Sequence, residues 1–302
     1  MALTLAEGAK LSNDVLLEGV IETAIADSPV LQRMPFIEIV GNGLTYNREN
    51  APATAGFYAV GDTWSEDTPT FTQVTATLKI LGGDADVDHY LARTRSNVQD
   101  LEAAVVALKA KAVQQAFDDT FINGDVSGDA KSFDGIDQAC AAGQTLAMGD
   151  DGGALTLTKL DELIDLVRGG KPDLLLMSRR TRRSLTALGR AAGSGVVEQD
   201  RDAFGRMVQY YDGIPVGVDD YIADDQTVGG SDDCSTIYAV QFGEGGVAGL
   251  TGPGGLTVER VGSLETKDAS RIRVKWYVSL AVFNELKLAK LTGVRTAEAA
   301  AA

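Results

Sequence analysis

The sequence predicts an α+β fold, and three patterns along the chain support that prediction. Segments in which apolar and polar residues alternate strictly, such as 71–80 and 272–278, indicate long strands with one buried face and one face in water. Segment 96–121 has apolar residues at steps of three and four, which predicts one long helix. Segment 51–71 follows neither period, so we expect an extended loop there.

The composition is that of a folded and strongly acidic chain. Of its 302 residues, 44% are hydrophobic and 23% are charged, and 43 Asp and Glu against 27 Lys and Arg give a formal charge of −16. Because nucleic-acid phosphates are also negative, this charge disfavours a protein that binds nucleic acid with its whole surface. The N-terminal residues lack the pattern of a secretion signal, and no run of 18 apolar residues predicts a membrane span.

The first predicted element is an amphipathic helix over 11–27, in which Ser12 is suited to cap the first turn. Pro29 and Pro35 interrupt the chain after it, so we expect the helix to sit on an extended arm that ends near a strand over 43–47. Another surface must cover the apolar stripe of this helix. The stripe consists of Val15, Leu16, Val20, Ile21, Ala24 and Ile25.

Four aromatic residues distinguish the loop over 51–71. Aromatic side chains are costly to leave in water, and Trp and Tyr commonly anchor partner surfaces. The residues alone leave two interpretations equally open: the loop binds a partner, or it folds back over the core of its own chain. The aromatic residues are Phe57, Tyr58, Trp64 and Phe71.

His89 is the only histidine of the chain, so any catalysis that needs a histidine would have to use it. It shares no recognisable motif with a Ser or Cys nucleophile. A metal site with the carboxylates that precede it is chemically feasible, but strand alternation places Asp86 and Asp88 on one face and His89 on the other. We therefore favour a solvated strand face over a metal site formed by Asp84, Asp86, Asp88 and His89.

The long helix begins with a capping-box pattern, in which Gln99 follows Ser96 by three residues. About 25 residues span roughly 37 Å, which suits a structural spine. The apolar residues predict one narrow seam, made of Val98, Leu101, Val105, Leu108 and Ala112.

The second half of the chain predicts helices that alternate with strands. Helices over 158–167 and 178–192 flank a buried strand over 173–177. The run Gly243–Ala248 has a dinucleotide-binding spacing, but the glycines that follow cannot start a helix, so we expect a turn. Further strands are predicted over 208–211, 214–218, 236–242, 256–261 and 272–278.

Concentrated charge occurs twice in this half. Four arginines open the helix over 178–192, where they oppose the helix dipole, and we expect acidic partners for them. Because the net charge is −16, we favour Asp and Glu of another copy over phosphates or ligand carboxylates. The acidic run 219–233 predicts a solvated loop rather than a calcium site, and Cys140 and Cys234 predict structural thiols. The arginines are Arg179, Arg180, Arg182 and Arg183.

Several motifs, each weak by itself, become specific through their order and spacing. Together they cover nearly the whole chain, which resembles the major capsid proteins of tailed bacteriophages with the Hong Kong 97-like fold. The motifs are the strand 74–82, Phe121-Ile-Asn-Gly-Asp125, Phe133-Asp-Gly-Ile136, Leu174-Leu-Leu-Met-Ser178, Gly213-Ile-Pro-Val216, Ile237-Tyr-Ala-Val-Gln-Phe-Gly243 and Arg273-Val-Lys-Trp-Tyr277.

The resemblance implies an L-shaped subunit. Residues 1–50 form an N-terminal arm and 51–72 an extended loop that lies over a neighbouring subunit. The peripheral domain spans 73–139 with the spine helix and is completed by about 256–275. The axial domain spans 140–255 and is completed by about 276–302. Hexamers and pentamers then close an icosahedral shell around double-stranded DNA, in a virion assembled in the host bacterial cytoplasm.

The resemblance also implies which residues and partners carry the function. It implies no catalytic residue, cofactor or metal and no membrane, and it implies a portal protein, a separate scaffolding protein and a decoration protein as partners. Because 51–73 contains no Lys, we expect no covalent cross-link from the loop. Two alternatives stay open: an encapsulin-like nanocompartment shell, and an acidic metal-dependent α/β enzyme. The expected interface residues are Phe57, Tyr58, Trp64, Phe71, Arg179, Arg180, Arg182 and Arg183.

Overall fold

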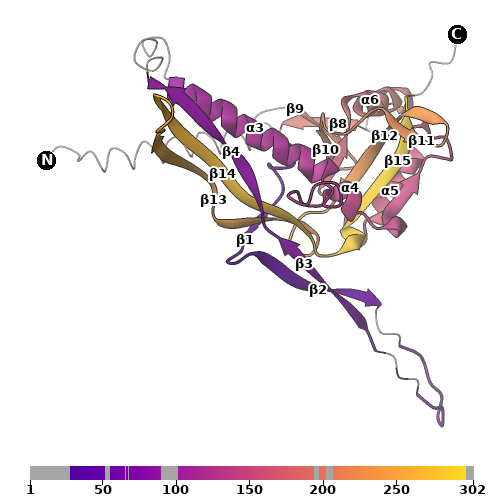
Figure 1. Cartoon of the computed structure of the whole chain (residues 1–302). Helices are drawn as coiled ribbons and strands as arrows, with labels where there is room; N and C mark the ends of the chain where they lie inside the picture. The colour runs from indigo at the N-terminus through magenta and orange to yellow at the C-terminus, as the bar shows by residue number, and fades with distance from the viewer. Residues whose placement is uncertain are drawn as a thin grey trace.

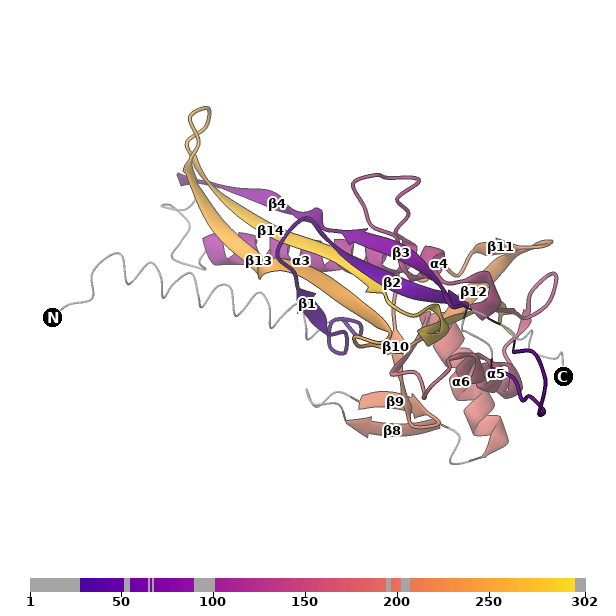
Figure 2. The ribbon, with the colours of Figure 1, turned by 90° about the horizontal axis from the view of Figure 1, so that it is seen from below.

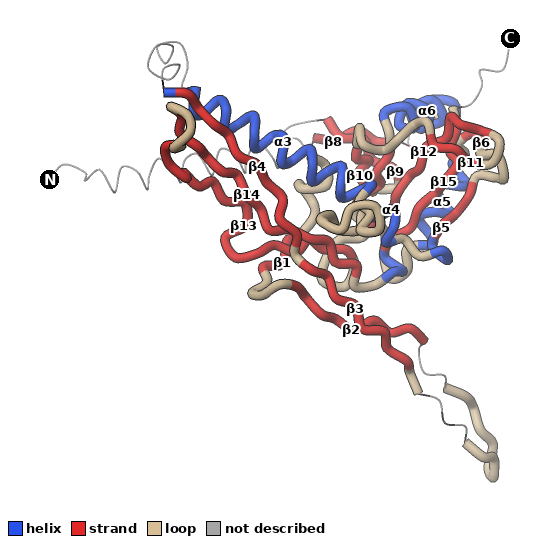
Figure 3. Tube along the Cα trace, in the orientation of Figure 1, coloured by secondary structure: helices blue, strands red, loops and turns tan. Residues whose placement is uncertain are grey.

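The computed structural model describes residues 28–51, 55–64, 66, 68–89, 101–193, 197–201 and 207–296. Within these ranges, the strands form a long sheet, a nine-stranded sheet and a hairpin. The long sheet and one helix extend to one side, the nine-stranded sheet forms a compact body on the other, and the hairpin projects away from both (Figures 1 and 3). The predicted arm helix over 11–27 lies outside the described residues.

The long sheet has the strand order β1-β13-β14-β4. Its strands are as long as the alternation predicts, and β14 pairs antiparallel with both β13 and β4. The helix α3 runs along one face of this sheet (Figures 1 and 2). The bounds are β1 Phe36–Glu38, β4 Lys79–Asp88, α3 Leu101–Asn123, β13 Val247–Ser263 and β14 Ala269–Val282.

The packed side of α3 differs from the predicted seam. Val106 and Phe117 are fully buried on the side that meets the sheet, and the Phe117 ring centroid lies 4.9 Å from that of Trp276 on β14. Leu108, a seam residue, is 70% exposed. The side of α3 that meets the long sheet is therefore not the predicted seam. Apolar residues occur on two sides of this helix, and periodicity alone does not say which side meets the sheet.

The predicted strand over 71–80 is two strands. The hairpin strand β3 ends at Thr77, and β4 begins in the long sheet at Lys79. Between them the Leu78 N–H donates to the Asn42 carbonyl at 2.9 Å, where the chain passes from the hairpin into the sheet. The alternation continues through this junction, so the sequence pattern does not reveal it.

The compact body is built on the nine-stranded sheet, whose main path among the described strands is β5-β15-β12-β7-β10-β9-β8. The central strand β7 is fully buried, as its apolar run predicts. The strand bounds are β5 Thr145–Ala147, β6 Gly153–Ala154, β7 Leu174–Met177, β8 Val197–Arg201, β9 Met207–Tyr211, β10 Ile214–Val218, β11 Gln226–Val228, β12 Ser231–Val240 and β15 Leu288–Arg295.

Helices α5 and α6 of the body begin at side-chain caps. The Thr156 hydroxyl accepts the Lys159 N–H before α5, and the Ser178 hydroxyl accepts the Thr181 N–H before α6. Gly243–Gly246 form a turn between β12 and β13, as expected, and Val247 begins β13. The bounds are α4 Ile136–Ala139, η1 Ala142–Gln144, α5 Leu157–Leu166, α6 Arg179–Ala192 and η2 Glu285–Lys287.

The chain crosses between the two sheets near residues 240–247 and 282–288. The strand β13 already starts at Val247, and β14 stays in the long sheet to Val282, so both reach beyond the divisions expected near 255 and 276. No helix among the described residues is long and apolar enough to cross a membrane.

Candidate assembly surface

The projecting hairpin consists of β2 (Gly43–Ala51) and β3 (Thr70–Thr77). In the part of the chain that the structure describes, these strands pair with each other and with no third strand. A two-stranded ribbon is marginally stable in water when nothing packs on it. The hairpin therefore depends on contacts at its base and on whatever covers its outer part.

The base of the hairpin is fixed to the end of β14. The Arg48 Nε donates to the Val282 carbonyl at 2.9 Å, and its Nη1 lies 2.5 Å from Glu285 Oε1. The Tyr46 hydroxyl donates to the same carbonyl at 3.0 Å. Because these contacts span from the hairpin to the junction between the two sheets, they set the direction in which the hairpin leaves the subunit.

The loop beyond the hairpin exposes aromatic side chains. Phe57 is fully exposed, Trp64 is 76% exposed and Phe71 is 65% exposed. Tyr58 is half-buried, and its ring stacks on Trp64 with a centroid distance of 4.4 Å. The structure thus brings Tyr58 and Trp64 together and places none of the four over the core of its own chain, which favours the partner-binding interpretation.

The first two arginines of α6 form ion pairs with acidic residues of the same chain. Arg179 Nε lies 2.5 Å from Asp220 Oδ1, and Arg180 Nε lies 3.4 Å from Asp224 Oδ1. Arg180 also donates to the Asp233 carbonyl at 2.7 Å. The sequence favoured acidic residues of another copy for these contacts. Their role in a subunit interface stays a prediction.

The acidic run 219–233 is accordingly more than a solvated loop. Arg295 Nε lies 2.6 Å from Asp233 Oδ1, and this hydrogen bond lowers the pKa of the Asp233 carboxyl. Two other carboxylates of the run pair with α6, as described above. Sequence reasoning missed these pairs because they join segments far apart in the chain, which only the sheet order brings together.

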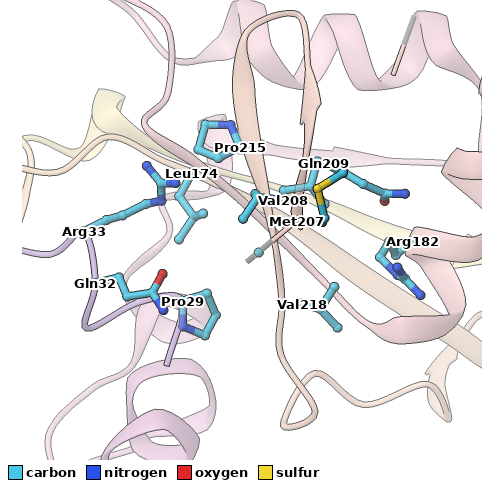
Figure 4. A pocket seen from close by; sticks show the side chains of 12 residues that line it. Pro29, Gln32, Arg33, Leu174, Arg182, Met207, Val208, Gln209, Pro215 and Val218 are labelled. Carbon is cyan, nitrogen blue, oxygen red and sulfur yellow. The ribbon is translucent and has the colours of Figure 1, made fainter. Parts of the chain in front are cut away.

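The third arginine, Arg182, lines a groove between the arm and the body (Figure 4). Its Nε is buried and has no hydrogen-bond partner among the described residues, and Arg33 lines the groove from the arm. Pro29, Val208 and Pro215 supply apolar surface, so the groove has the chemistry to hold a carboxylate beside an apolar group. The fourth arginine, Arg183, is exposed.

The acidic row of β4 is paired with arginines of β14. Arg273 Nε lies 2.6 Å from Asp84 Oδ1, and Arg271 Nε lies 2.7 Å from Asp86 Oδ1. These hydrogen bonds lower the pKa of each carboxyl. Asp88 is exposed. Among the described residues, no group of three His, Cys, Asp or Glu is arranged to hold a metal ion.

Two buried carboxyls escaped sequence reasoning. Asp118 on α3 accepts a hydrogen bond from the Ser28 hydroxyl at 2.7 Å, and burial raises its pKa to about 7. Asp219 accepts the Tyr221 N–H at 2.9 Å, and burial raises its pKa to about 6. Asp118 is one acidic residue within a helical pattern, and Asp219 opens an acidic run predicted to be solvated, so neither position signals burial.

Comparison with known proteins agrees with this geometry. The model of the phage capsid family matches residues 8–293. The structure is similar to the SrpI encapsulin of Synechococcus elongatus PCC 7942, with 18% identity, a TM-score of 0.72 and coverage of 90% of this chain and 89% of the other. No curated protein sequence matches at a significant level.

Two further similar structures come from a GTA particle and from a phage. The capsid of an empty GTA particle has 17% identity, a TM-score of 0.65 and coverage of 88% and 90%. The structure from Mycobacterium phage Bobi has 15% identity, a TM-score of 0.61 and coverage of 90% and 91%. These similarities show the Hong Kong 97-like α+β fold, and the match of the family model shows that the chain belongs to the phage capsid family.

Proposed function

We propose that the chain is the major capsid protein of a tailed phage, which assembles as hexamers and pentamers into an icosahedral shell around double-stranded DNA. The capsid family and the capsid-like fold support a shell protein. The negative charge of −16 supports a wall along which packed DNA slides without sequence-specific binding. The shell forms in the host bacterial cytoplasm and becomes part of the virion.

The observation that carries this proposal is the projecting hairpin with its exposed aromatic residues. Phe57 and Trp64 would expose a large apolar area in an isolated subunit. A neighbouring copy that covers them stabilises both the loop and the shell. Because each copy offers one hairpin and one body, the contact is head-to-tail and closes into rings.

The proposal includes partners and excludes catalysis. A portal protein, a separate scaffolding protein and a decoration protein complete the particle. Asp84 and Asp86 pair with Arg273 and Arg271, which supports a structural role for these two carboxylates rather than a role as metal ligands.

An encapsulin-like nanocompartment is the second candidate, and the similarity to the SrpI encapsulin supports it. Such a shell would enclose a protein cargo instead of a genome. The surfaces described above suit a phage capsid and a nanocompartment equally. The contents of the particle, DNA or protein, therefore distinguish the two candidates.

The experiment is expression of the chain followed by electron microscopy and analysis of the contents of native particles. We expect closed icosahedral shells, and nuclease-protected double-stranded DNA in particles from the natural host. Protein cargo without DNA would instead support the nanocompartment. Subunits that stay monomeric under all salt and crowding conditions would contradict both shells.

A further inference from the structure

The helix α3 carries apolar side chains on two sides, and the described chain covers one of them. Val106 and Phe117 face the long sheet and are fully buried. On the other side Leu108 is 70% exposed, Ala112 is exposed and Val105 is half-buried. Residues 105, 108 and 112 follow at steps of three and four, so they share one face. We call this face the exposed seam.

The exposed seam has the character of a helix-packing surface. A narrow apolar stripe at alternating steps of three and four is what one helix presents to another in a coiled coil. Lys111 lies beside the seam and is exposed. The seam therefore fits an amphipathic helix with acidic residues beside its apolar face.

The sequence of this chain contains such a segment, residues 12–27. It carries the apolar stripe of the arm, and Leu17, which is not counted in that stripe, shares one helix face with its positions 20, 21 and 24. Asp14, Glu18 and Glu22 follow one another at steps of four along one side of the stripe. Charge and apolar pattern thus both complement the exposed seam and its lysine.

The described chain begins beside α3, at Ser28. Ser28 is 1% exposed, and its hydroxyl donates to Asp118 of α3 at 2.7 Å. Two parallel helices rise equally, by about 1.5 Å per residue. In a helix that runs back from Ser28 parallel to α3, position 18 would be level with Leu108, ten residues before Asp118, and Leu17 would lie within one residue of that level.

We propose that residues 12–27 dock in cis on the exposed seam as a helix parallel to α3, with Leu17 against Leu108. In this register Lys111 lies at the level of residue 21, within one helical turn of both Glu18 and Glu22. The inference goes beyond the shell function and does not rest on it, because the contact forms within one subunit. Its consequence is that the arm has a fixed place on the spine and directs residues 1–11 toward the far end of α3.

A disulfide between Leu17→Cys and Leu108→Cys tests the register in the full chain, with Cys140→Ala and Cys234→Ala as background. We expect an intrachain disulfide in most subunits after mild oxidation, detected as a linked peptide joining positions 17 and 108. The matched control pairs Leu17→Cys with Leu286→Cys at the sheet junction, where we expect none.

The outcomes separate this inference from the proposed function. Interchain dimers linked through positions 17 and 108 would overturn docking in cis and show that the segment crosses to a second copy. Absence of any link would overturn the seam as its site. Electron microscopy of unoxidised particles of the same variants reports shell formation independently of either result.

A charge exchange provides a second test. We expect Lys111→Glu to speed proteolysis within residues 1–27 about tenfold, because it repels Glu18 and Glu22. Adding Glu18→Lys and Glu22→Lys should restore protection. Lys131→Glu, on an exposed loop, is the control. Protection that Lys111→Glu leaves unchanged would contradict the proposed charge contact.

Discussion

The compact body and the projecting hairpin use strands in opposite ways. In the body, every residue of β7 is buried between neighbouring strands and helices. In the hairpin, no residue whose exposure is described is buried, and the ribbon has no third strand among the described residues. The body is stabilised by its own core, whereas the hairpin needs another surface. Variants in the two regions should therefore separate subunit stability from assembly.

The largest expected effect is on the core of the body. Leu176→Ala should lower the free energy of unfolding of the subunit by about 2–5 kcal/mol, because it removes a fully buried side chain and leaves a cavity. Denaturant unfolding of unassembled subunits measures this. Leu176→Met, which conserves volume, is the control and should cost less than about 1.5 kcal/mol. Equal stability of Leu176→Ala and the unmodified chain would contradict the assignment of β7 to the core.

The buried Asp118 predicts a pH dependence. A carboxyl whose pKa is raised from 3.8 to about 7 binds its proton more tightly when folded, so it stabilises the subunit below pH 3.8 and loses that contribution as the pH rises to about 7. Asp118→Asn should remove this loss, and thus raise the melting temperature at about pH 8 relative to the unmodified chain. The gain is on the order of 2 kcal/mol.

Thermal unfolding from acid to mildly alkaline pH checks this prediction. Asp129→Asn, on an exposed loop, is the matched control and should follow the unmodified chain. Parallel pH profiles for Asp118→Asn and the unmodified chain would show that folding does not raise the pKa of this carboxyl.

In the hairpin region, Trp64→Ala should weaken assembly without lowering subunit melting. A buried interface aromatic contributes about 2 kcal/mol or more, so the concentration needed for assembly should rise roughly thirtyfold. Light scattering measures assembly, and calorimetry of unassembled subunits measures melting. Trp64→Phe is the control that retains the aromatic ring. Equal loss of assembly and of melting would place Trp64 in the subunit's own core.

The smallest expected effect concerns the base of the hairpin. Arg48→Ala should loosen the hairpin by about 1 kcal/mol, because the Val282 carbonyl loses its guanidinium donors. Hydrogen exchange should become faster in β2 and β3 and stay unchanged in β7. Arg48→Lys keeps the charge and should restore part of the protection. Unchanged exchange in Arg48→Ala would show that Tyr46 alone holds the base.

The sequence predicts the helices and strands of this fold better than it predicts where they join and which sides of them are packed. The alternation identifies long strands, and the aromatic loop is recognisable because it lacks a period. The same alternation continues across Leu78, so it hides the junction between hairpin and sheet. For α3 the period predicts a helix but does not identify the side that meets the sheet, because Leu108 and Phe117 both belong to apolar stripes.

The sequence predicts the part of the assembly surface that has an unusual amino-acid composition. It does not predict ion pairs between residues that are far apart in the chain. Aromatic residues in a polar loop signal a binding surface by themselves. The pairing of Arg179 with Asp220 depends on strand order, which the local sequence does not encode. The burial of Asp118 likewise depends on the arm that packs on it through Ser28.

A reconstruction of the assembled particle by cryo-electron microscopy tests the central claim most directly. We predict that Trp64 is buried against the body of a neighbouring copy in every hexamer and pentamer. A closed shell in which the loop around Trp64 stays in solvent, with subunits joined elsewhere, would contradict the account.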